Sequence, residues 1–126
     1  VDEAALVRAM RDRIRFALDI VDALGHKQVV LGAWGCGVFG WEAELVSELF
    51  REELASGSHG IELAIFAVPR DRFNENLACF EHALSTFPER NQVSFADALA
   101  ERRAAEQAAA AAEEDDGEED DWRKYL

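Results

Sequence analysis

Long hydrophobic runs, cysteine and histidine are all scarce in this sequence. No apolar run approaches the roughly 20 residues that span a bilayer, because charged residues interrupt every hydrophobic stretch. The two cysteines, Cys36 and Cys79, fit neither a disulfide framework nor a clustered zinc site, which favours a reducing compartment such as the cytoplasm or the nucleus. The histidines are scattered, at His26, His59 and His82. We therefore expect no membrane segment, no metal site and no bound cofactor.

Basic residues are also few: 13 Lys and Arg stand against 26 Asp and Glu, and the formal net charge is −13. Eight of the acidic residues lie in the run 113–121, so the rest of the chain carries only −5. A mildly acidic body exerts no long-range attraction on nucleic acid, and we expect no direct nucleic-acid binding. The acidic run has nothing apolar to bury and is predicted to be disordered.

Hydrophobic periodicity predicts an α/β order of elements. Apolar residues three or four positions apart predict amphipathic helices, and two short apolar runs predict strands. The expected elements, in chain order, are a helix over 4–24, a strand over 27–31, a helix over 41–54, a strand over 61–68, a helix over 73–84 and an alanine-rich helix over 96–112. The near-continuous apolar character of 61–68 predicts a strand that is buried on both faces.

The strand–helix–strand order predicts one parallel βαβ unit with a right-handed crossover and a ligand site at the carboxyl ends of its strands. Two strands form a marginal sheet with open edges. Because the sequence also enters a helical pattern within a few residues of Val1, we expect a piece of a larger α/β fold. Residues 1–90 are expected to form the folded part, and residues 91–126 an Ala-rich helix and a C-terminal acidic tail.

Between the first strand and the second helix lies a glycine-rich segment with Gly35, Gly37 and Gly40. Glycines permit positive φ and close approach of the backbone, and successive N–H groups beside a helix N-terminus bind phosphate without a lysine. A tight turn that only lets strand and helix pack is the alternative. The spacing also matches the G-x-G-x-x-G of dinucleotide-binding folds, yet neither Glu62 nor Asp71 stands where the ribose-binding acid of such folds is expected.

The longer string VVLGAWGCGVFG, residues 29–40, closely resembles the signature of the microbial-type poly(ADP-ribose) glycohydrolase family, and the resemblance covers roughly residues 11–87. It implies part of a macrodomain-like three-layer α/β fold whose partner is ADP-ribose or poly(ADP-ribose). The loop over the pyrophosphate would comprise Gly35, Cys36, Gly37, Val38, Phe39 and Gly40. Phe39 would lie against a ribose, and Phe73 and Asn76 would meet the adenine end, with helix packing as the alternative role of Phe73.

Two departures from the family pattern stand out. The family has Asn, followed closely by Pro, after the last loop glycine, where this chain has Trp41-Glu42-Ala43, so the helix loses its side-chain cap. The family's catalytic loop, a glycine triplet followed by Gln-Glu-Glu, does not occur here. We therefore expect a fragment that carries the pyrophosphate loop but no catalytic residue. The alternatives are a noncatalytic ADP-ribose-binding macrodomain module and, less in keeping with the residues, a Rossmann-like dinucleotide-binding domain.

Overall fold

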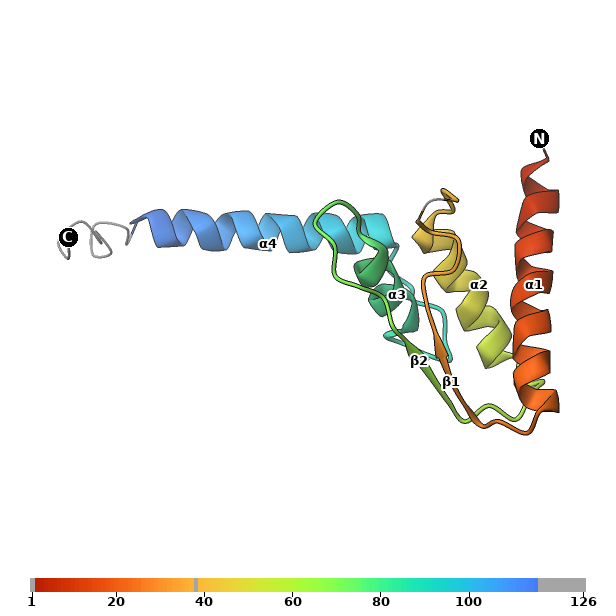
Figure 1. Cartoon of the computed structure of the whole chain (residues 1–126). Helices are drawn as coiled ribbons and strands as arrows, with labels where there is room; N and C mark the ends of the chain where they lie inside the picture. The colour runs from red at the N-terminus through yellow and green to blue at the C-terminus, as the bar shows by residue number, and fades with distance from the viewer. Residues whose placement is uncertain (1, 38, 116–126) are drawn as a thin grey trace, which may run out of the picture. The chain divides into compact units, whose positions relative to one another are not determined.

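The computed structural model describes residues 2–37 and 39–115 of the chain. Its elements, in order, are α1 (Glu3–Ala23), β1 (Gln28–Leu31), α2 (Ala43–Ala55), β2 (Leu63–Phe66), α3 (Asn76–Leu84) and α4 (Phe95–Asp115) (Figure 1). The chain divides into two compact units, Val1–Gln92 and Val93–Leu126, which are described separately. The mixed α/β class expected from the sequence is confirmed.

Helix α1 begins at a side-chain cap and ends at a glycine. Asp2 Oδ1 accepts hydrogen bonds from the N–H groups of Ala4 and Ala5 at 3.0 and 3.4 Å, which satisfies donors that the first turn leaves free. The helix ends just before Gly25, whose φ of 77° few other residues adopt. The apolar stripe predicted from the sequence is buried at Met10, Ile14 and Leu18. This face of α1 packs against α2.

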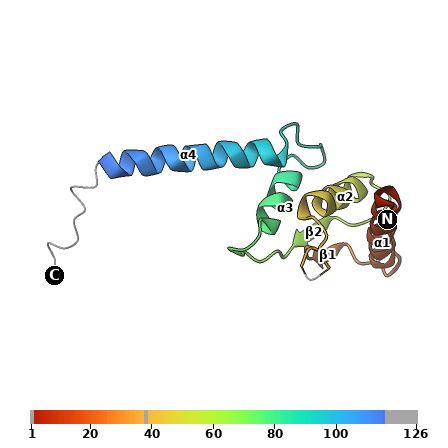
Figure 2. The same cartoon turned by 90° about the horizontal axis from the view of Figure 1, so that it is seen from above.

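Strands β1 and β2 pair in parallel, as predicted, with Val29 opposite Ala64 and Leu31 opposite Phe66. Figure 2 shows the two strands seen from above, with α2 on one side of them. The prediction that 61–68 is buried on both faces was wrong, because Leu63 and Ile65 of β2 are 45% and 50% exposed. Alternate side chains of a strand point to opposite faces. Among the described residues, helices cover only the face that carries Leu31 and Phe66.

Aromatic side chains join this covered face of the sheet to α2 and α3. The Phe66 ring of β2 lies 5.2 Å from that of Phe50 on α2 and 5.3 Å from that of Phe80 on α3, measured between centroids. Trp34, in the loop after β1, lies 6.3 Å from Phe50. Phe50 and Phe80 are 1% and 2% exposed. These contacts place the start of the glycine loop on a packed core.

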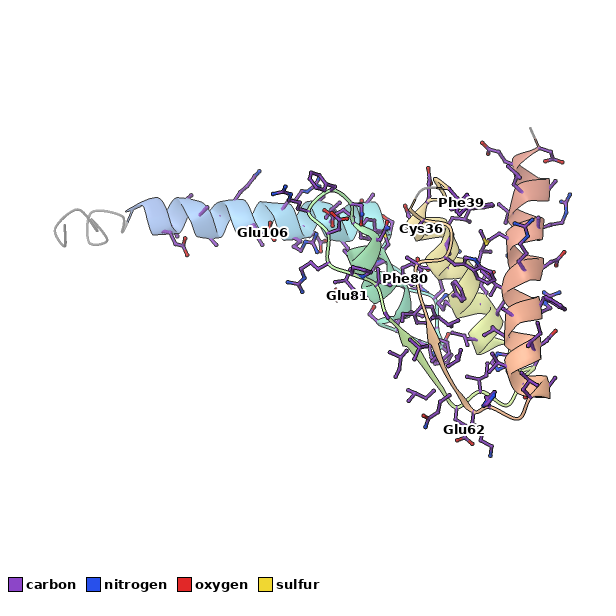
Figure 3. All side chains as sticks on the ribbon, in the orientation of Figure 1. Cys36, Phe39, Glu62, Phe80, Glu81 and Glu106 are labelled. Carbon is purple, nitrogen blue, oxygen red and sulfur yellow. The ribbon has the colours of Figure 1, made fainter. Side chains whose placement is uncertain are left out.

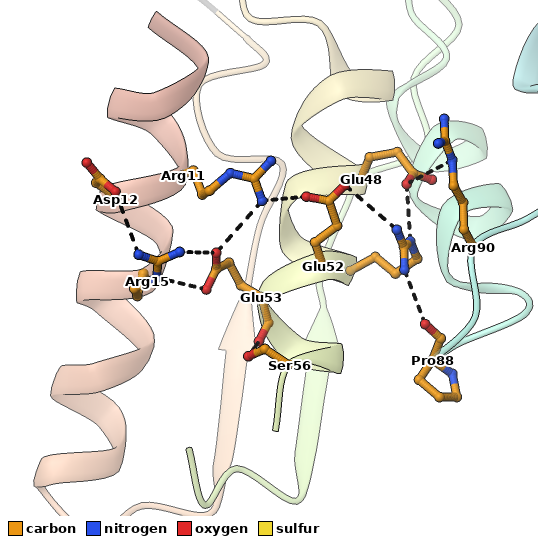
Figure 4. Close-up of polar contacts among 10 residues, drawn as sticks. Arg11, Asp12, Arg15, Glu48, Glu52, Glu53, Ser56, Pro88 and Arg90 are labelled. Atoms are coloured by element: carbon orange, nitrogen blue, oxygen red, sulfur yellow. Dashed lines mark hydrogen bonds and ion pairs between the residues drawn. The ribbon is translucent and has the colours of Figure 1, made fainter. Parts of the chain in front are cut away.

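Ion pairs join α2 to its neighbours (Figure 4). Arg15 of α1 donates from Nε and Nη2 to the buried carboxylate of Glu53, at 3.2 and 2.9 Å, and this contact raises the pKa of Arg15. On the other side of α2, Arg51 pairs with Glu48 of the same helix at 3.1 Å and donates to the Pro88 carbonyl oxygen at 3.2 Å. The ion pair with Arg15 and the hydrogen bond to Pro88 hold α2, the helix that follows the glycine loop, from two directions.

Replacing Arg51 by methionine is expected to lower the free energy of unfolding by about 2 kcal/mol, because a buried side chain loses hydrogen bonds to a charged and a backbone acceptor. Arg51 is 7% exposed. The exposed Lys27–Glu62 pair, 3.6 Å apart, provides the control: Lys27→Met should cost well under about 1 kcal/mol. Urea unfolding curves measure both, and equal losses in the two variants would contradict the assignment.

The second unit, described by itself, is built on α4. The Ser94 hydroxyl accepts the Asp97 N–H at 3.1 Å and so caps its start, and alanine, the strongest helix former, fills much of its length. The helix ends at Asp115, so the prediction of disorder from residue 113 was wrong for the first three acidic residues. The remainder of the acidic run lies outside the described residues.

Candidate functional site

The glycine loop folds through a series of short-range backbone hydrogen bonds. The N–H groups of Trp34, Cys36, Gly40 and Trp41 donate to carbonyl oxygens within the loop, at 2.9, 3.1, 3.0 and 2.9 Å. The loop leaves the carboxyl end of β1 and enters the N-terminus of α2, and Figure 3 shows Cys36 and Phe39 together at that end of the helix. The loop is therefore compact and held against α2. Val38 lies outside the described residues.

The three loop glycines serve different purposes. Gly35 and Gly40 have φ of 77° and 72°, in the left-handed region that other residues rarely adopt. A Cβ at Gly35 would also lie 2.8 Å from Cδ1 of Trp41. Gly37 does not have a positive φ, and a Cβ there would meet nothing within 4 Å. The backbone fold thus requires glycine at 35 and 40, whereas a side chain at 37 would project into open space.

The loop satisfies its carbonyl groups more fully than its N–H groups. The carbonyl oxygens of residues 32–37 all accept hydrogen bonds, at Gly32, Ala33, Trp34, Gly35, Cys36 and Gly37. In the part of the chain that the structure describes, the N–H groups of Gly35, Gly37 and Phe39 meet no acceptor. A loop whose carbonyl oxygens already have partners, and whose remaining N–H groups have none, suits an anion.

Helix α2 adds the favourable end of its dipole to this surface. Its N-cap is Glu42, whose side chain makes no capping hydrogen bond, so the loss of the cap predicted from Trp41-Glu42-Ala43 is confirmed. The first N–H groups of an uncapped helix carry a partial positive charge. The acidic Glu44 in the first turn interacts favourably with that charge.

Trp41 packs against the glycine loop, a contact that the sequence pattern did not reveal. Its indole lies against Gly35, and the Met10 side chain of α1 approaches the same point, with Cε 3.4 Å from where a Cβ of residue 35 would lie. The Trp41 N–H donates to the Gly35 carbonyl oxygen. The residue that takes the place of the family's cap therefore contacts the loop, at a point that Met10 of α1 also approaches.

An open pocket of about 520 Å³ lies next to the loop, on the side of α1. Apolar side chains of α1, the loop and α2 form most of its wall, and two carboxylates complete it; the lining residues are Glu3, Leu6, Val7, Phe39, Gly40, Trp41, Glu42 and Leu45. A pocket of this size accommodates a sugar or a base. The loop thus has space beside it for more than a bare phosphate.

Of the expected adenine-side residues, Asn76 reaches the glycine loop and Phe73 does not contact the core. Asn76 Nδ2 donates to the Cys36 carbonyl oxygen at 3.4 Å. The prediction that helix 73–84 begins at Phe73 was wrong, because α3 begins at Asn76 and Phe73 is 80% exposed in the preceding turn. Asp71 Oδ1 accepts the Phe73 N–H at 2.8 Å, and the Arg72 guanidinium lies 4.7 Å from the Phe73 ring centroid. Helix packing is therefore not the role of Phe73.

The exposed ring of the loop itself is Phe39, which is 84% exposed. The alternative that Phe39 anchors the loop in the core is excluded, because a core residue is shielded from water. Trp34, at 42% exposure, packs on Phe50 and has a structural role. An aromatic ring in water beside free N–H groups is available to lie against a sugar or a base.

Neither cysteine is arranged as a nucleophile. Burial raises the pKa of Cys36, and burial together with Glu44 and Glu75 raises that of Cys79 to about 11. Neither thiol therefore has the lowered pKa that marks a reactive cysteine. Across the described residues, no group of three His, Cys, Asp or Glu side chains comes together to hold a metal ion.

Three comparisons with known proteins bear on this site. No family model matches the chain, and no curated protein matches it. Among solved structures, the crystal structure of poly(ADP-ribose) glycohydrolase from Deinococcus radiodurans in complex with ADP-ribose matches with a TM-score of 0.61 and 30% sequence identity. The match covers 69% of this chain and 36% of that enzyme. The chain is thus similar in fold and sequence to about a third of a bacterial poly(ADP-ribose) glycohydrolase.

Proposed function

We propose that residues 1–90 form the C-terminal half of a macrodomain-like ADP-ribose-binding domain of the poly(ADP-ribose) glycohydrolase type. The ligand is ADP-ribose or poly(ADP-ribose), and Gly35–Gly40 holds its pyrophosphate. The observation that carries the proposal is the hydrogen bonding of the loop: the carbonyl oxygens of residues 32–37 all accept hydrogen bonds, and among the described residues the N–H groups of Gly35, Gly37 and Phe39 meet no acceptor. The similarity to an enzyme that was crystallised with ADP-ribose supports the same ligand here.

The acidic character of the chain does not oppose this ligand. Backbone N–H groups and a helix N-terminus stabilise phosphate at short range and need no lysine or arginine. Phe39, exposed next to these donors, would cover a ribose face. Long-range attraction is absent at a net charge of −13, so binding depends on these local contacts.

The chain does not supply the catalytic acid in this proposal. Cleavage of a glycosidic bond requires a carboxyl group beside the departing oxygen. Three carboxylates near the start of α2 come into question. Glu48 accepts a hydrogen bond from Arg51, whereas Glu42 and Glu44 stand at the N-cap and in the first turn of the helix without the glycine-rich setting that would press one of them against a ligand. We expect the 126-residue chain to release no ADP-ribose from poly(ADP-ribose), and chromatography of the incubated polymer checks this expectation.

The variant Gly37→Val tests the binding surface while sparing the fold. A side chain at 37 projects into open space and needs no left-handed φ, so the thermal midpoint should change little. The isopropyl group would keep a phosphate away from the neighbouring N–H groups, and we expect ADP-ribose affinity to fall at least about tenfold, equivalent to about 1.4 kcal/mol. Nuclear magnetic resonance titration of the labelled 126-residue chain measures the affinity and identifies the amides that move.

Gly32→Ala serves as the matched control. A Cβ at 32 would lie 3.9 Å from the Ala67 carbonyl oxygen, an ordinary contact, and the residue precedes the N–H groups in question. Its ADP-ribose affinity should equal that of the unmodified chain. Undiminished binding in a folded Gly37→Val variant would remove the loop from the site. Tighter binding of NAD than of ADP-ribose would instead favour the dinucleotide-binding alternative.

A further inference from the structure

A side chain of α3 holds one carbonyl group of the glycine loop. Most carbonyl groups of residues 32–37 are satisfied by donors from within the segment 34–41. The Cys36 carbonyl oxygen is the exception, since its donor is Nδ2 of Asn76, 40 residues further along the chain. The orientation of the Cys36–Gly37 peptide therefore depends on a different element of the fold.

This dependence determines where a neighbouring N–H group points. The Cys36 carbonyl and the Gly37 N–H belong to one planar trans peptide and point in opposite directions. A hydrogen bond that holds the carbonyl toward Asn76 therefore turns the Gly37 N–H away from α3, where it meets no acceptor among the described residues. We propose that Asn76 is a positioning residue, which orients the Gly37 N–H toward an anion bound on the loop. This inference rests on the proposed function of the loop.

The peptide needs such a restraint because residue 37 is glycine. Rotation of a peptide plane by half a turn, as between type I and type II turns, carries the following residue to positive φ, which glycine adopts at little cost. A rotated Cys36–Gly37 peptide would present its carbonyl oxygen where the N–H had been. That oxygen would repel a phosphate, so one conformer of the peptide binds an anion and the other does not.

Asn76 is itself held firmly enough to act as a restraint. Its backbone N–H donates to Oδ1 of Asn74 at 3.0 Å, and Nδ2 of Asn74 donates to Asp71 at 3.2 Å. One turn later on the same helix, Cys79 and Phe80 are buried at 7% and 2% exposure. The backbone of Asn76 is thus placed by the hydrogen-bonded turn before it and by the buried residues of α3 after it, and its side chain starts from a fixed point.

The experiment compares the full 126-residue chain with Asn76→Ala by nuclear magnetic resonance, using ADP-ribose as the probe. We expect about tenfold weaker binding, which corresponds to about 1.4 kcal/mol, and an unchanged thermal midpoint. The ligand-induced shift of the Gly37 amide should shrink while that of Gly35 persists. Before any ligand is added, the Gly37 amide signal should already be displaced or broadened by exchange between peptide orientations. If Asn76 only stabilised the fold, its replacement would affect many amide signals and not the Gly37 amide in particular.

Two further variants sharpen the comparison. Asn76→Asp keeps the size of the side chain but cannot donate to a carbonyl oxygen, so it should weaken binding at least as much as Asn76→Ala. Asn91→Ala removes an asparagine that donates to the His82 carbonyl oxygen, beyond the other end of α3, and should leave both the affinity and the Gly37 amide unchanged. Equal affinities and equal Gly37 signals in Asn76→Ala and the unmodified chain would overturn the inference.

Failure of the proposed function gives a different result. In that case the unmodified chain would show no shift of the Gly35, Gly37 or Phe39 amides at millimolar ADP-ribose. The spectrum without ligand would then decide whether Asn76 orients the peptide. A Gly37 amide displaced by Asn76→Ala would support the restraint, and an undisturbed one would refute it.

Discussion

Replacing Phe50 by alanine is expected to lower the free energy of unfolding by about 3–5 kcal/mol, the range for large aromatic residues removed from a core. Phe50 is 1% exposed, and its ring contacts those of Trp34, Phe66 and Phe80. The substitution removes the ring that α2 shares with the sheet and with α3. Because a single small domain has only about 5–15 kcal/mol of stability, this loss removes a large share of it.

Urea unfolding followed by circular dichroism measures this loss. Phe16→Ala is the control, since Phe16 lies on α1 with 67% of its surface exposed and its removal should change the stability by no more than about 0.5 kcal/mol. Similar unfolding midpoints for Phe50→Ala and Phe16→Ala would show that the aromatic cluster does not hold the fold.

The second large effect is expected at Gly35, where alanine should cost roughly 2–4 kcal/mol. The left-handed φ of 77° contributes about 1–2 kcal/mol of that loss. The remainder comes from overpacking, because the new Cβ would lie 2.8 Å from Cδ1 of Trp41 and 3.4 Å from Cε of Met10. Either the indole or the loop must move, and the bond from the Trp41 N–H to the Gly35 carbonyl resists that movement.

Two other loop glycines separate these contributions. Gly40→Ala carries the same kind of φ, 72°, but its Cβ meets nothing within 4 Å, so it should show the conformational cost alone. Gly37→Ala has neither the positive φ nor the close contact, so its stability should be nearly unchanged. Thermal unfolding of the three variants should therefore rank them Gly35, Gly40, Gly37 in decreasing loss. Equal losses of stability in Gly35→Ala and Gly40→Ala would show that the Trp41 side chain moves aside without a measurable energetic cost.

The elements of this fold were largely predictable from the sequence because their patterns are local. The stripe Met10, Ile14 and Leu18 marks α1 by its spacing alone, and the strand–loop–helix order located the parallel pairing of β1 with β2. Burial of β2 was not predictable in the same way. Apolar residues on both faces, Leu63 and Ile65 on one and Ala64 and Phe66 on the other, indicated two covered faces, yet the described chain covers only the second. A pattern within one strand contains no information about its neighbours.

The candidate site was predictable to the same extent. The glycines located the loop. They did not reveal that a side chain is tolerated at 37 but not at 35, because that difference arises from the position of Trp41. The contact between Asn76 and Cys36 joins residues 40 positions apart and follows from the packing of α3 against α2. Phe73 is exposed because it lies in the turn at Asp71, before α3 begins at Asn76. Its apolar spacing to the residues of α3 therefore did not reveal that it lies outside the helix.

The contact of Trp41 with Gly35 also has a consequence for how the sequence can vary. The indole occupies the volume that a side chain at position 35 would need, and Met10 closes the same space from α1. Substitutions at positions 10 and 41 are therefore coupled. A smaller residue at 41 would leave a cavity beside Gly35, which a larger side chain at 10 could fill. Among relatives that share this loop, we therefore expect substitutions at 10 and 41 to co-vary while 35 remains glycine.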